Sequence, residues 1–386
     1  MATRGLRFKH LTLVNWRNFT NVDVALQPRV IVVGPNASGK SNLLDVFRFL
    51  HDIVSPIDGG FQTAVTNRGG VAKLRSLAAH QSLPGASISV VVGTDDEDIW
   101  NYYLRFTKDR RGKPTILEER IQGRKTDISR PNKLDQRDPE RLTQTYIEQV
   151  SQNKSYREFT DFLESVRYLH LVPEIIRGSE LTVRRESAFD PYGRDFLEQL
   201  ARTPVKTRDK WLKKINNALK FAVPQLSELE LWKDELGRPH LRGKYLHWRP
   251  KGSWQTEEEF SDGTIRLVGI LWSLLNGKGP VLFEEPELSL HPAVVRYIPQ
   301  VLARVKNQTS RQIFLSTHSA ELLEDKGIGL DEVIVLAPQE EGTLAKVASG
   351  LKNVRALLRG GGSMAEAVLP ITRPNTVEQL GFFAVE

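Results

Sequence analysis

The amino-acid sequence predicts an α/β fold: a mixed-sheet core in two parts, residues 1–125 and 260–386, with a largely helical lobe inserted at residues 126–259. Three observations predict it. A continuous β-branched run at residues 30–33 is typical of a buried strand, and helical spacing of apolar residues follows it. Later apolar runs end in polar side chains and resume this strand pattern. Helical segments fill much of the stretch between the two parts.

The first part of the core is predicted to consist mostly of strands. Residues 6–33 read as strands with a turn, and residues 11–14 alternate between apolar and other side chains. Residues 86–92 and 99–107 are predicted to form a hairpin closed by the acidic turn at residues 95–98. We therefore expect an antiparallel β subdomain beside the parallel strands.

Two stretches lack a clear strand pattern. Residues 55–85 carry several glycines and are expected to be a loop. Residues 108–141 are rich in lysine and arginine, and a solvated edge and loop is the favoured interpretation.

Residues 226–260 are predicted to be short strands joined by turns. Basic and aromatic residues interleave at residues 244–254, as they do on nucleic-acid-binding surfaces. A twisted hairpin leading into the next helix is the favoured interpretation, and nucleic-acid contact stays open. Near the end of the chain, Ser363 and Glu366 have the spacing of a capping box, which predicts a final helix beginning there.

Composition limits the classes of protein to consider. The chain of 386 residues is 40% hydrophobic and can bury a sizeable core. It has no cysteine, which excludes disulfides, cysteine nucleophiles and thiolate metal sites. The apolar run at residues 267–275 is far shorter than the ~20 residues of a membrane span, and residues 1–8 lack the pattern of a secretory signal. We expect a cytoplasmic protein with no membrane contact.

The formal net charge of +7 favours an anionic partner. Nucleic acid is the first candidate, and a merely basic, soluble surface is the alternative.

A glycine-rich turn follows the strand at residues 30–33 and leads into a helix. Its spacing, with glycines five apart followed by lysine and serine, is that of a phosphate loop. Glycines let backbone amides face phosphate oxygens, and the positive end of the helix dipole lies behind them. Lys40 would reach the β- and γ-phosphates of a nucleotide and Ser41 would hold Mg²⁺. The expected phosphate-contacting residues are Gly34, Pro35, Asn36, Ala37, Ser38, Gly39, Lys40, Ser41 and Asn42.

The apolar run at residues 280–283 delivers two adjacent carboxylates, Glu284 and Glu285, at its C-terminal end. In a parallel α/β sheet this is the edge where ligands bind. We expect Glu284 to contribute to the Mg²⁺ shell and Glu285 to orient or deprotonate an attacking water.

Two further motifs follow the same order along the chain. Ser261, Asp262 and Gly263 precede an apolar helix, so that a hydroxyl and free amides lie at a helix N-terminus and could meet an anion. An ordinary N-cap explains them as well. A buried strand at residues 313–317 ends in His318, which by itself would more often be structural than functional.

The order of these motifs resembles that of ABC-type ATPases, and the branch that contains RecF, SMC and OLD proteins in particular. The residues that carry the resemblance are the phosphate loop, the Ser-Asp-Gly helix start, the two glutamates with Leu290, His291 and Pro292 after them, and the Ser-Thr-His-Ser stretch. Residues 15–19 look like the opening motif of this branch, which transporter ATPases lack. The resemblance covers residues 1–50 and 260–320.

The resemblance implies a role for each matching residue. Lys40 and Ser41 would form the Walker A pair, Glu284 would be the Walker B acid, Glu285 the catalytic base and His318 the switch histidine. The resemblance also places Arg17 near the base or α-phosphate of ATP, makes Ser261, Asp262 and Gly263 the signature motif, and puts Leu290, His291 and Pro292 at the D-loop.

Two departures from the family pattern concern the site. Glutamate stands at position 284, where aspartate is commoner, and its longer side chain would shift the metal or contact it through water. This predicts slow hydrolysis. The Q-loop glutamine stays unassigned, because Gln81 and the neighbourhood of residues 171–174 both lie in suitable connections.

The family implies ATP and Mg²⁺ as cofactors and a head-to-tail dimer or higher oligomer, in which each signature motif completes the other subunit's site. We expect an ATPase whose ATP state is coupled to DNA-linked work in prokaryotic phage defence or DNA repair, with a separate effector protein. The alternative is an ATP-gated oligomeric scaffold that holds and releases a protein effector without binding DNA. A transporter motor subunit is a third and weaker interpretation.

Overall fold

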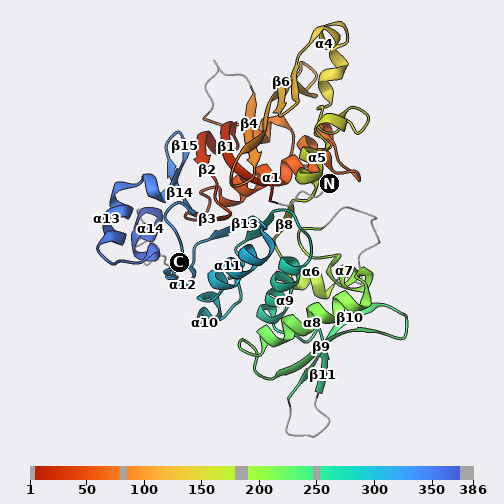
Figure 1. Ribbon diagram of the computed structural model, residues 1–386, viewed down its shortest axis with the longest axis vertical. Coiled ribbons are helices and arrows are strands. Elements are labelled where there is room, and N and C mark those ends of the chain that lie inside the picture. The colour runs from red at the N-terminus through yellow and green to blue at the C-terminus, as the bar shows by residue number, and fades with distance from the viewer. Residues whose placement is uncertain (1–4, 79–84, 179–189, 247–252, 374–386) are drawn as a thin grey trace, which may run out of the picture.

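The structure is a computed structural model that describes residues 5–78, 85–178, 190–246 and 253–373, and within these ranges two six-stranded sheets and one three-stranded sheet form (Figure 1). The core sheet has the order β15 (Gly342–Val347), β14 (Val333–Gln339), β3 (Arg29–Val33), β13 (Ile313–Thr317), β12 (Val281–Glu284) and β8 (Arg167–Leu169). The antiparallel sheet has the order β2 (Phe19–Ala25), β1 (Arg7–Trp16), β4 (Ala86–Gly93), β5 (Asp98–Lys108), β6 (Pro114–Gly123) and β7 (Thr126–Arg130).

The core sheet unites strands from both ends of the chain. β3 pairs in parallel with β13 and β14, and β12 pairs in parallel with β13 and β8. Every residue of β3 is buried, as its β-branched run predicts. The predicted α/β class with a mixed core sheet and an antiparallel subdomain is confirmed.

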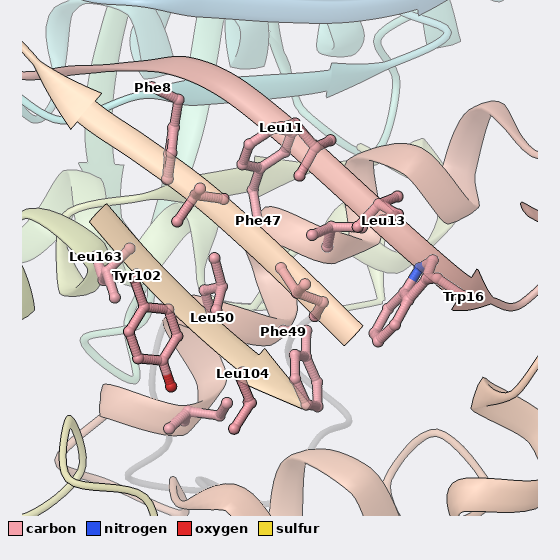
Figure 2. Close-up of a cluster of buried hydrophobic side chains, with 14 of the residues drawn as sticks. Phe8, Leu11, Leu13, Trp16, Phe47, Phe49, Leu50, Tyr102, Leu104 and Leu163 are labelled. Atoms are coloured by element: carbon pink, nitrogen blue, oxygen red, sulfur yellow. The ribbon is translucent and has the colours of Figure 1, made fainter. Parts of the chain in front are cut away.

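The helix α1 (Lys40–Val54) packs between the core sheet and the antiparallel sheet. Phe47 on α1 contacts Phe8 of β1 and Phe314 of β13, with ring centroids 4.6 Å apart in each pair. Figure 2 shows side chains of α1, β1 and β5 converging in this cluster. Burying aromatic rings from three elements fixes α1, and with it the loop that precedes it, relative to both sheets.

The predicted hairpin at residues 86–107 is present as β4 and β5, and Val92 pairs with Trp100. The stretch at residues 55–85, expected to be a loop, differs from its prediction: its described part holds two short helices, α2 (Phe61–Thr66) and α3 (Val71–Leu74). Gly60 and Gly70, which suggested a loop, have positive φ and lie at the N-caps of these helices. Apolar residues such as Phe61 and Leu74 are buried and hold the helices on the core.

Residues 126–259 do not form one separate unit. The predicted division after residue 125 falls in the turn between β6 and β7, which pair with each other, and β8 lies at the edge of the core sheet. The remaining elements of this stretch lie apart: α4 is at the upper end of Figure 1, whereas α8 and the three-stranded sheet are at its lower end. These elements are α4 (Lys133–Arg137), η1 (Pro139–Thr143), η2 (Asn153–Ser155), α5 (Arg157–Glu164), α6 (Pro173–Arg177), α7 (Phe196–Arg202), α8 (Val205–Leu219), β9 (Leu226–Lys233), β10 (Pro239–Tyr245) and β11 (Ser253–Thr256).

The hairpin favoured for residues 244–254 is present where the structure describes that stretch, because β10 pairs with β11 and Lys244 lies opposite Trp254. The predicted capping box is also present: Ser363 and Glu366 cap the last described helix. The remaining helices are α9 (Asp262–Leu275), α10 (Pro292–Val295), α11 (Ile298–Thr309), α12 (Ala320–Leu323), η4 (Ala348–Gly350), α13 (Lys352–Arg359) and α14 (Met364–Thr372). No helix in the described part of the chain is long and apolar enough to cross a membrane.

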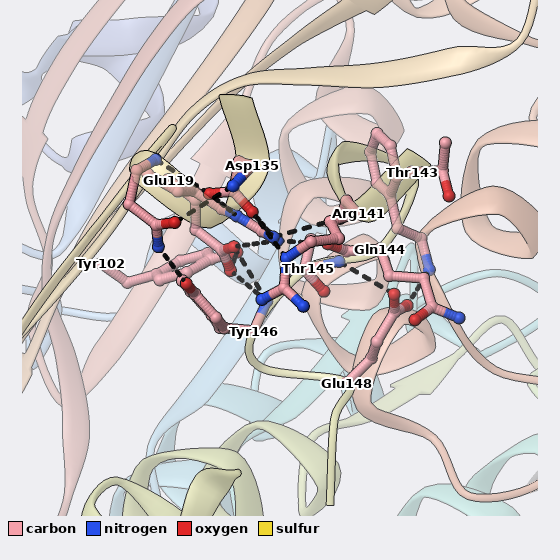
Figure 3. A network of polar contacts seen from close by, with 12 residues as sticks. Tyr102, Glu119, Asp135, Arg141, Thr143, Gln144, Thr145, Tyr146 and Glu148 are labelled. Atoms are coloured by element: carbon pink, nitrogen blue, oxygen red, sulfur yellow. Dashed lines mark hydrogen bonds and ion pairs between the residues drawn. The ribbon is translucent and has the colours of Figure 1, made fainter. Parts of the chain in front are cut away.

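A buried polar network lies beneath the basic stretch at residues 108–141 (Figure 3). The Arg130 side chain is fully buried, and its Nη2 lies 2.8 Å from Asp135 Oδ1. Glu119 accepts hydrogen bonds from Tyr102 Oη at 3.1 Å and from the backbone amide of Tyr146. A solvated edge was therefore the wrong expectation for Arg130, because its charge is neutralised inside the fold.

Two carboxyl groups of this region resist ionisation. Burial raises the pKa of Glu119 from an ordinary 4.5 to about 7, and burial likewise raises the pKa of Glu148 to about 7. The raised pKa favours the protonated form in the folded protein, so this contribution to stability is complete below pH 4.5 and is lost as the pH rises through about 7.

We predict that Glu148→Gln makes stability less dependent on pH. Between pH 5 and pH 8 the parent should lose stability as Glu119 and Glu148 ionise, and a loss of about 1 kcal/mol corresponds to roughly 2–4 °C in melting temperature. The melting temperature of the variant should depend less steeply on pH, whatever its absolute value. Thermal unfolding followed by circular dichroism at several pH values measures this. The exposed Glu341→Gln is the control, and an unchanged slope in Glu148→Gln would contradict the assignment.

Candidate functional site

Three parallel strands end side by side at one edge of the core sheet. In the parallel register Glu284 at the end of β12 lies beside Ser316, and Thr317 at the end of β13 lies beside Val33 of β3. The loop after β3, the acids after β12 and the histidine after β13 therefore meet at this edge. The carboxyl edge of a parallel sheet is the usual ligand-binding position.

The loop of residues 34–39 joins β3 to α1 through a tight turn. Gly39 is the N-cap of α1 with φ of 95°, and a Cβ there would lie 2.3 Å from Asn18 Nδ2. Lys40 bends back over the loop, and its Nζ donates to the carbonyls of Gly34 at 3.0 Å and Pro35 at 3.3 Å. A cavity of about 410 Å³ opens here, lined by the loop, the start of α1 and both glutamates. Its amides and lysine suit an anionic ligand.

Glu284 is held by hydroxyl groups on both of its oxygens. Ser41 Oγ donates to Oε1, and Tyr168 Oη on β8 donates to Oε2. Burial, together with the neighbouring carboxylate, raises the pKa of Tyr168 above its ordinary value, which keeps the phenol protonated as the donor. His170 Nδ1 lies 3.8 Å from the same oxygen. Oxygen donors that converge in this way are the ligands Mg²⁺ prefers.

Glu285 bridges the lysine and the histidine. Its backbone has φ of 42°, a left-handed conformation that non-glycine residues seldom adopt, and its amide donates to the carbonyl of Ser316 at 3.1 Å. Its Oε1 lies 3.4 Å from Lys40 Nζ and 3.2 Å from His318 Nδ1. Strain of this kind collects at functional sites, and here it accompanies a carboxylate that faces two cationic or hydrogen-bonding groups.

A third carboxyl group, Glu287, fastens the two strand ends together. Thr317 Oγ1 donates to Glu287 Oε1 at 2.5 Å, and the amide of His318 donates to the same oxygen at 3.3 Å. Burial raises the pKa of Glu287. The contact fixes the backbone from which the His318 side chain extends toward Glu285.

Asn18, in the motif at residues 15–19, holds the phosphate loop in place through hydrogen bonds. Asn18 Nδ2 donates to the carbonyl of Ser38 at 2.7 Å and to Thr343 Oγ1 at 2.8 Å, and Asn42 donates to Asn18 Oδ1 at 2.7 Å. Asn18 thereby ties the loop, α1 and β15 together.

Arg17, expected near the base or α-phosphate of a nucleotide, lies next to the loop. Its Nη2 contacts Asp45 Oδ2 on α1 at 2.7 Å, and Arg68 contacts the same carboxylate. Arg17 also lines a cleft of about 710 Å³ beside the loop, together with Asn18 and Asn42. The volume of the cleft is sufficient for a nucleoside next to the phosphate-loop cavity.

The serine, aspartate and glycine at residues 261–263 begin α9. Ser261 Oγ accepts from the amide of Thr264 at 3.2 Å, and Asp262 Oδ1 lies 2.5 Å from Arg177 Nη2. A Cβ at Gly263 would lie 2.5 Å from the carbonyl of Ser289, so this turn packs on the segment before His291. None of residues 261–263 is among the described residues that line the phosphate-loop cavity of the same chain.

The structure thus brings together Lys40, Ser41, Glu284, Glu285 and His318, as the motif order predicts. Sequence reasoning missed Tyr168 and His170, because β8 is three residues long and lies inside the stretch assigned to a helical lobe. Of the two candidate positions for a Q-loop glutamine, residues 171–174 lead into α6, and Gln81 lies outside the described residues.

The phosphate loop, the acids on the neighbouring strand and the mixed sheet beside an antiparallel sheet define the head of an ABC-type ATPase. Within that class, the chain belongs to the family described as "AAA domain, putative AbiEii toxin, Type IV TA system", whose model matches residues 29–324. The match includes a portion of each predicted part of the core and the whole stretch between them.

Curated relatives match a short region. The DNA replication and repair protein RecF of Clavibacter sepedonicus is 37% identical over 73 residues, and that of Clavibacter michiganensis subsp. michiganensis is 36% identical over 73 residues. Each match spans 19% of this chain and 18% of the relative.

Solved structures share the fold over most of the chain. A Smc head bound to the C-winged helix domain of ScpA has a TM-score of 0.52 at 14% identity, covering 88% of this chain and 96% of that chain. A Smc head with an extended coiled coil from Pyrococcus furiosus, bound to the C-terminal domain of ScpA, has a TM-score of 0.51 at 13% identity and covers 92% and 100% of the two chains. These similarities concern the fold alone.

We predict that Asn18→Ala loosens the phosphate loop. The change removes three side-chain hydrogen bonds at a half-buried position, at a cost of about 1–3 kcal/mol in the free energy of unfolding. Urea denaturation measures this loss. The exposed Asn101→Ala on β5 is the matched control and should change stability by less than about 0.5 kcal/mol. Equal free energies of unfolding for the two variants would show that the hydrogen bonds of Asn18 contribute nothing to stability.

Proposed function

We propose that this chain binds ATP with Mg²⁺ and hydrolyses it. The observation that carries the proposal is the meeting of Lys40, Ser41, Glu284, Glu285 and His318 at one sheet edge, around a cavity formed by the phosphate loop. The amides of residues 36–41 and the start of α1 would receive the β- and γ-phosphates. Lys40 would exchange its contacts with loop carbonyls for phosphate oxygens and neutralise their charge.

Ser41 and Glu284 would hold the Mg²⁺, which when bound polarises the γ-phosphate and balances its charge. Their fit rests on the convergence of a hydroxyl and a carboxylate oxygen at the mouth of the cavity. Tyr168 would keep the longer glutamate side chain in place, since its hydrogen bond leaves the other oxygen directed at Ser41.

Glu285 would act on the attacking water. Its carboxylate would orient the water in line with the γ-phosphate and accept a proton as the bond to phosphorus forms. His318, which contacts Glu285 at 3.2 Å, would hold the carboxylate and hydrogen-bond the γ-phosphate, so that its position reports whether that phosphate is present.

Two chains would associate head to tail around ATP. Residues 261–263 lie outside the phosphate-loop cavity of their own chain, and the free amides at the N-terminus of α9 suit a phosphate from a second subunit. In the assembled pair, Ser261, Asp262 and Gly263 of each subunit would complete the site of the other. ATP would then stabilise the pair and hydrolysis would release it.

The ATP cycle would serve DNA-linked work in phage defence or DNA repair, with a separate effector protein. The family description, which names a type IV toxin system, and the local similarity to RecF support this proposal. The alternative, an ATP-gated scaffold that holds an effector protein without DNA, uses the same cycle. Duplex DNA would change the rate of hydrolysis in the first case and leave it unchanged in the second.

We predict opposite effects from two changes in the site. Lys40→Ala should abolish nucleotide binding, because the phosphates lose their main cation, whereas Glu285→Gln should retain binding but lower hydrolysis by at least about 100-fold. With ATP, Glu285→Gln should accumulate as a dimer in light scattering. Lys346→Ala, at an exposed position, should match the parent. Hydrolysis by Glu285→Gln at the parent rate would refute the catalytic assignment.

We predict that Tyr168→Phe raises the Mg²⁺ concentration needed for half-maximal ATP binding by roughly tenfold. The loss of one hydrogen bond to a charged group, about 1.5 kcal/mol, frees the Glu284 side chain. Calorimetric titration of ATP at a series of Mg²⁺ concentrations measures the shift, and affinity without Mg²⁺ should be unchanged. Tyr297→Phe, with its side chain largely exposed, is the control. A shift that is equal with and without Mg²⁺ would mean a merely structural role for Tyr168.

A further inference from the structure

The outward face of α8 carries a row of lysines. Lys206, Lys210, Lys213 and Lys214 are all exposed, and Lys220 follows at the end of the helix. Residues spaced by three and four positions lie on one face of a helix, so these side chains project in the same general direction. Within the described part of the chain, none of the five ammonium groups forms an ion pair.

This segment holds much of the excess positive charge of the protein. Residues 205–220 contain six basic residues and one acidic residue, Asp209, and Asp209 pairs with Arg208. The resulting net charge of +5 compares with +7 for the entire chain. The nearest acids of β9, Glu228 and Glu230, are paired with Lys244 and Arg242 on β10. The charge of the α8 lysines is therefore not cancelled by neighbouring elements.

The opposite face of α8 is fixed to the rest of the protein. Leu212, Ile215 and Leu219 are buried, and Asn216 Nδ2 donates to the carbonyl of Ser227 at 2.8 Å. An amphipathic helix binds lipid by inserting its apolar face. That face of α8 is already used in the core, which argues against a membrane as the partner of the lysines.

We propose that the lysine face of α8, defined as Lys206, Lys210, Lys213, Lys214 and Lys220, binds the phosphodiester backbone of nucleic acid. At 1.5 Å per residue the row extends over about 20 Å, a length that matches several successive phosphates of one strand. Lysines act as point charges toward phosphate and read no base edges, so binding is independent of sequence. We choose this partner because the positive charge of the lysine face complements the negative charge of the phosphates.

The basic stretch at residues 108–141 is the competing surface. Several of its cations are paired with acids, as Lys113 is with Glu140 and Arg124 with Glu97. Its exposed cations without ion pairs among the described residues are spread over the end of β5, two turns and α4 rather than along one face: Lys108, Arg110, Arg111, Lys125, Lys133 and Arg137. A dispersed set of charges suits a backbone less well than a continuous row.

The helix that carries the lysine face packs on α9, whose N-terminus holds the proposed signature motif. Trp211 of α8 packs edge to face on Trp272 of α9, with ring centroids 5.2 Å apart, and Ser261 is the N-cap of α9. This inference rests on the proposed function and extends it, because it places a nucleic-acid contact on a helix that packs against α9. The binding itself does not depend on ATP hydrolysis, so the two can fail separately.

The test replaces Lys206, Lys210, Lys213 and Lys214 together by glutamine. Binding of a fluorescent 30-base-pair duplex of arbitrary sequence is measured by anisotropy without nucleotide, over a range of salt concentrations. We expect an affinity loss of at least about tenfold at low salt and a slope of log K against log salt that is smaller by about 3, since four phosphate contacts are lost. Circular dichroism should show unchanged folding, because all four positions are exposed.

The matched control replaces Arg110, Arg111, Lys125 and Lys133 by glutamine, which removes the same charge from the competing surface. It should keep the parent affinity within about threefold and most of the salt slope. Parent-like binding by the α8 variant, or a larger loss in the control, would overturn the proposal. Binding of the parent to anionic phospholipid vesicles but not to the duplex would overturn it as well. Failure of the ATPase assays alone would leave it standing.

Discussion

The parallel pairing of β3, β13 and β12 is the constraint on which the rest of the structure depends. Three segments distant in sequence end at one edge only because these strands share direction and register. Gln312, next to the start of β13, strengthens the arrangement: its side chain accepts from the amide of Phe8 and donates to the carbonyls of Phe8 and Gln27. These bonds hold β1 of the antiparallel sheet on the core sheet, and α1 is enclosed between them. The phosphate loop thus begins and ends on elements that cannot move independently.

Three carboxyl groups lie within four residues of one another, and each is compensated in a different way. Glu284 accepts from two hydroxyl groups, Glu285 faces Lys40 and His318, and Glu287 is buried against Thr317. Like charges so close would repel one another in a dry environment. The hydrogen-bond donors on Glu284 and Glu287 and the cation next to Glu285 offset that repulsion.

Features formed by contiguous residues, or by motifs in a fixed order along the chain, could be predicted from the sequence. The β-branched run at residues 30–33 and the glycine spacing after it identify a strand and a loop from local physics alone, and the order of the later motifs indicates that they share the edge. Contacts between distant residues gave no such signal. Tyr168 meets Glu284 across 116 positions. Arg130 looked like part of a solvated basic stretch because its partners, Glu119 and Asp135, lie in that same stretch, and no sequence pattern shows that all three side chains are buried together. No spacing rule connects such residues before the fold does.

A continuous set of contacts connects α8, which carries the lysine face, with the proposed nucleotide site. The Trp211–Trp272 contact joins α8 to α9, and a Cβ at Gly269 of α9 would lie 2.5 Å from Leu171 Cδ1, so α9 also touches the segment that follows β8. β8 carries Tyr168, the residue that donates to Glu284. A displacement of α9 caused by a partner on α8 would therefore be felt at two places: at Ser261, which would contribute to a second subunit's site, and at Tyr168, which holds the carboxylate proposed for Mg²⁺. Close packing makes such a path physically available.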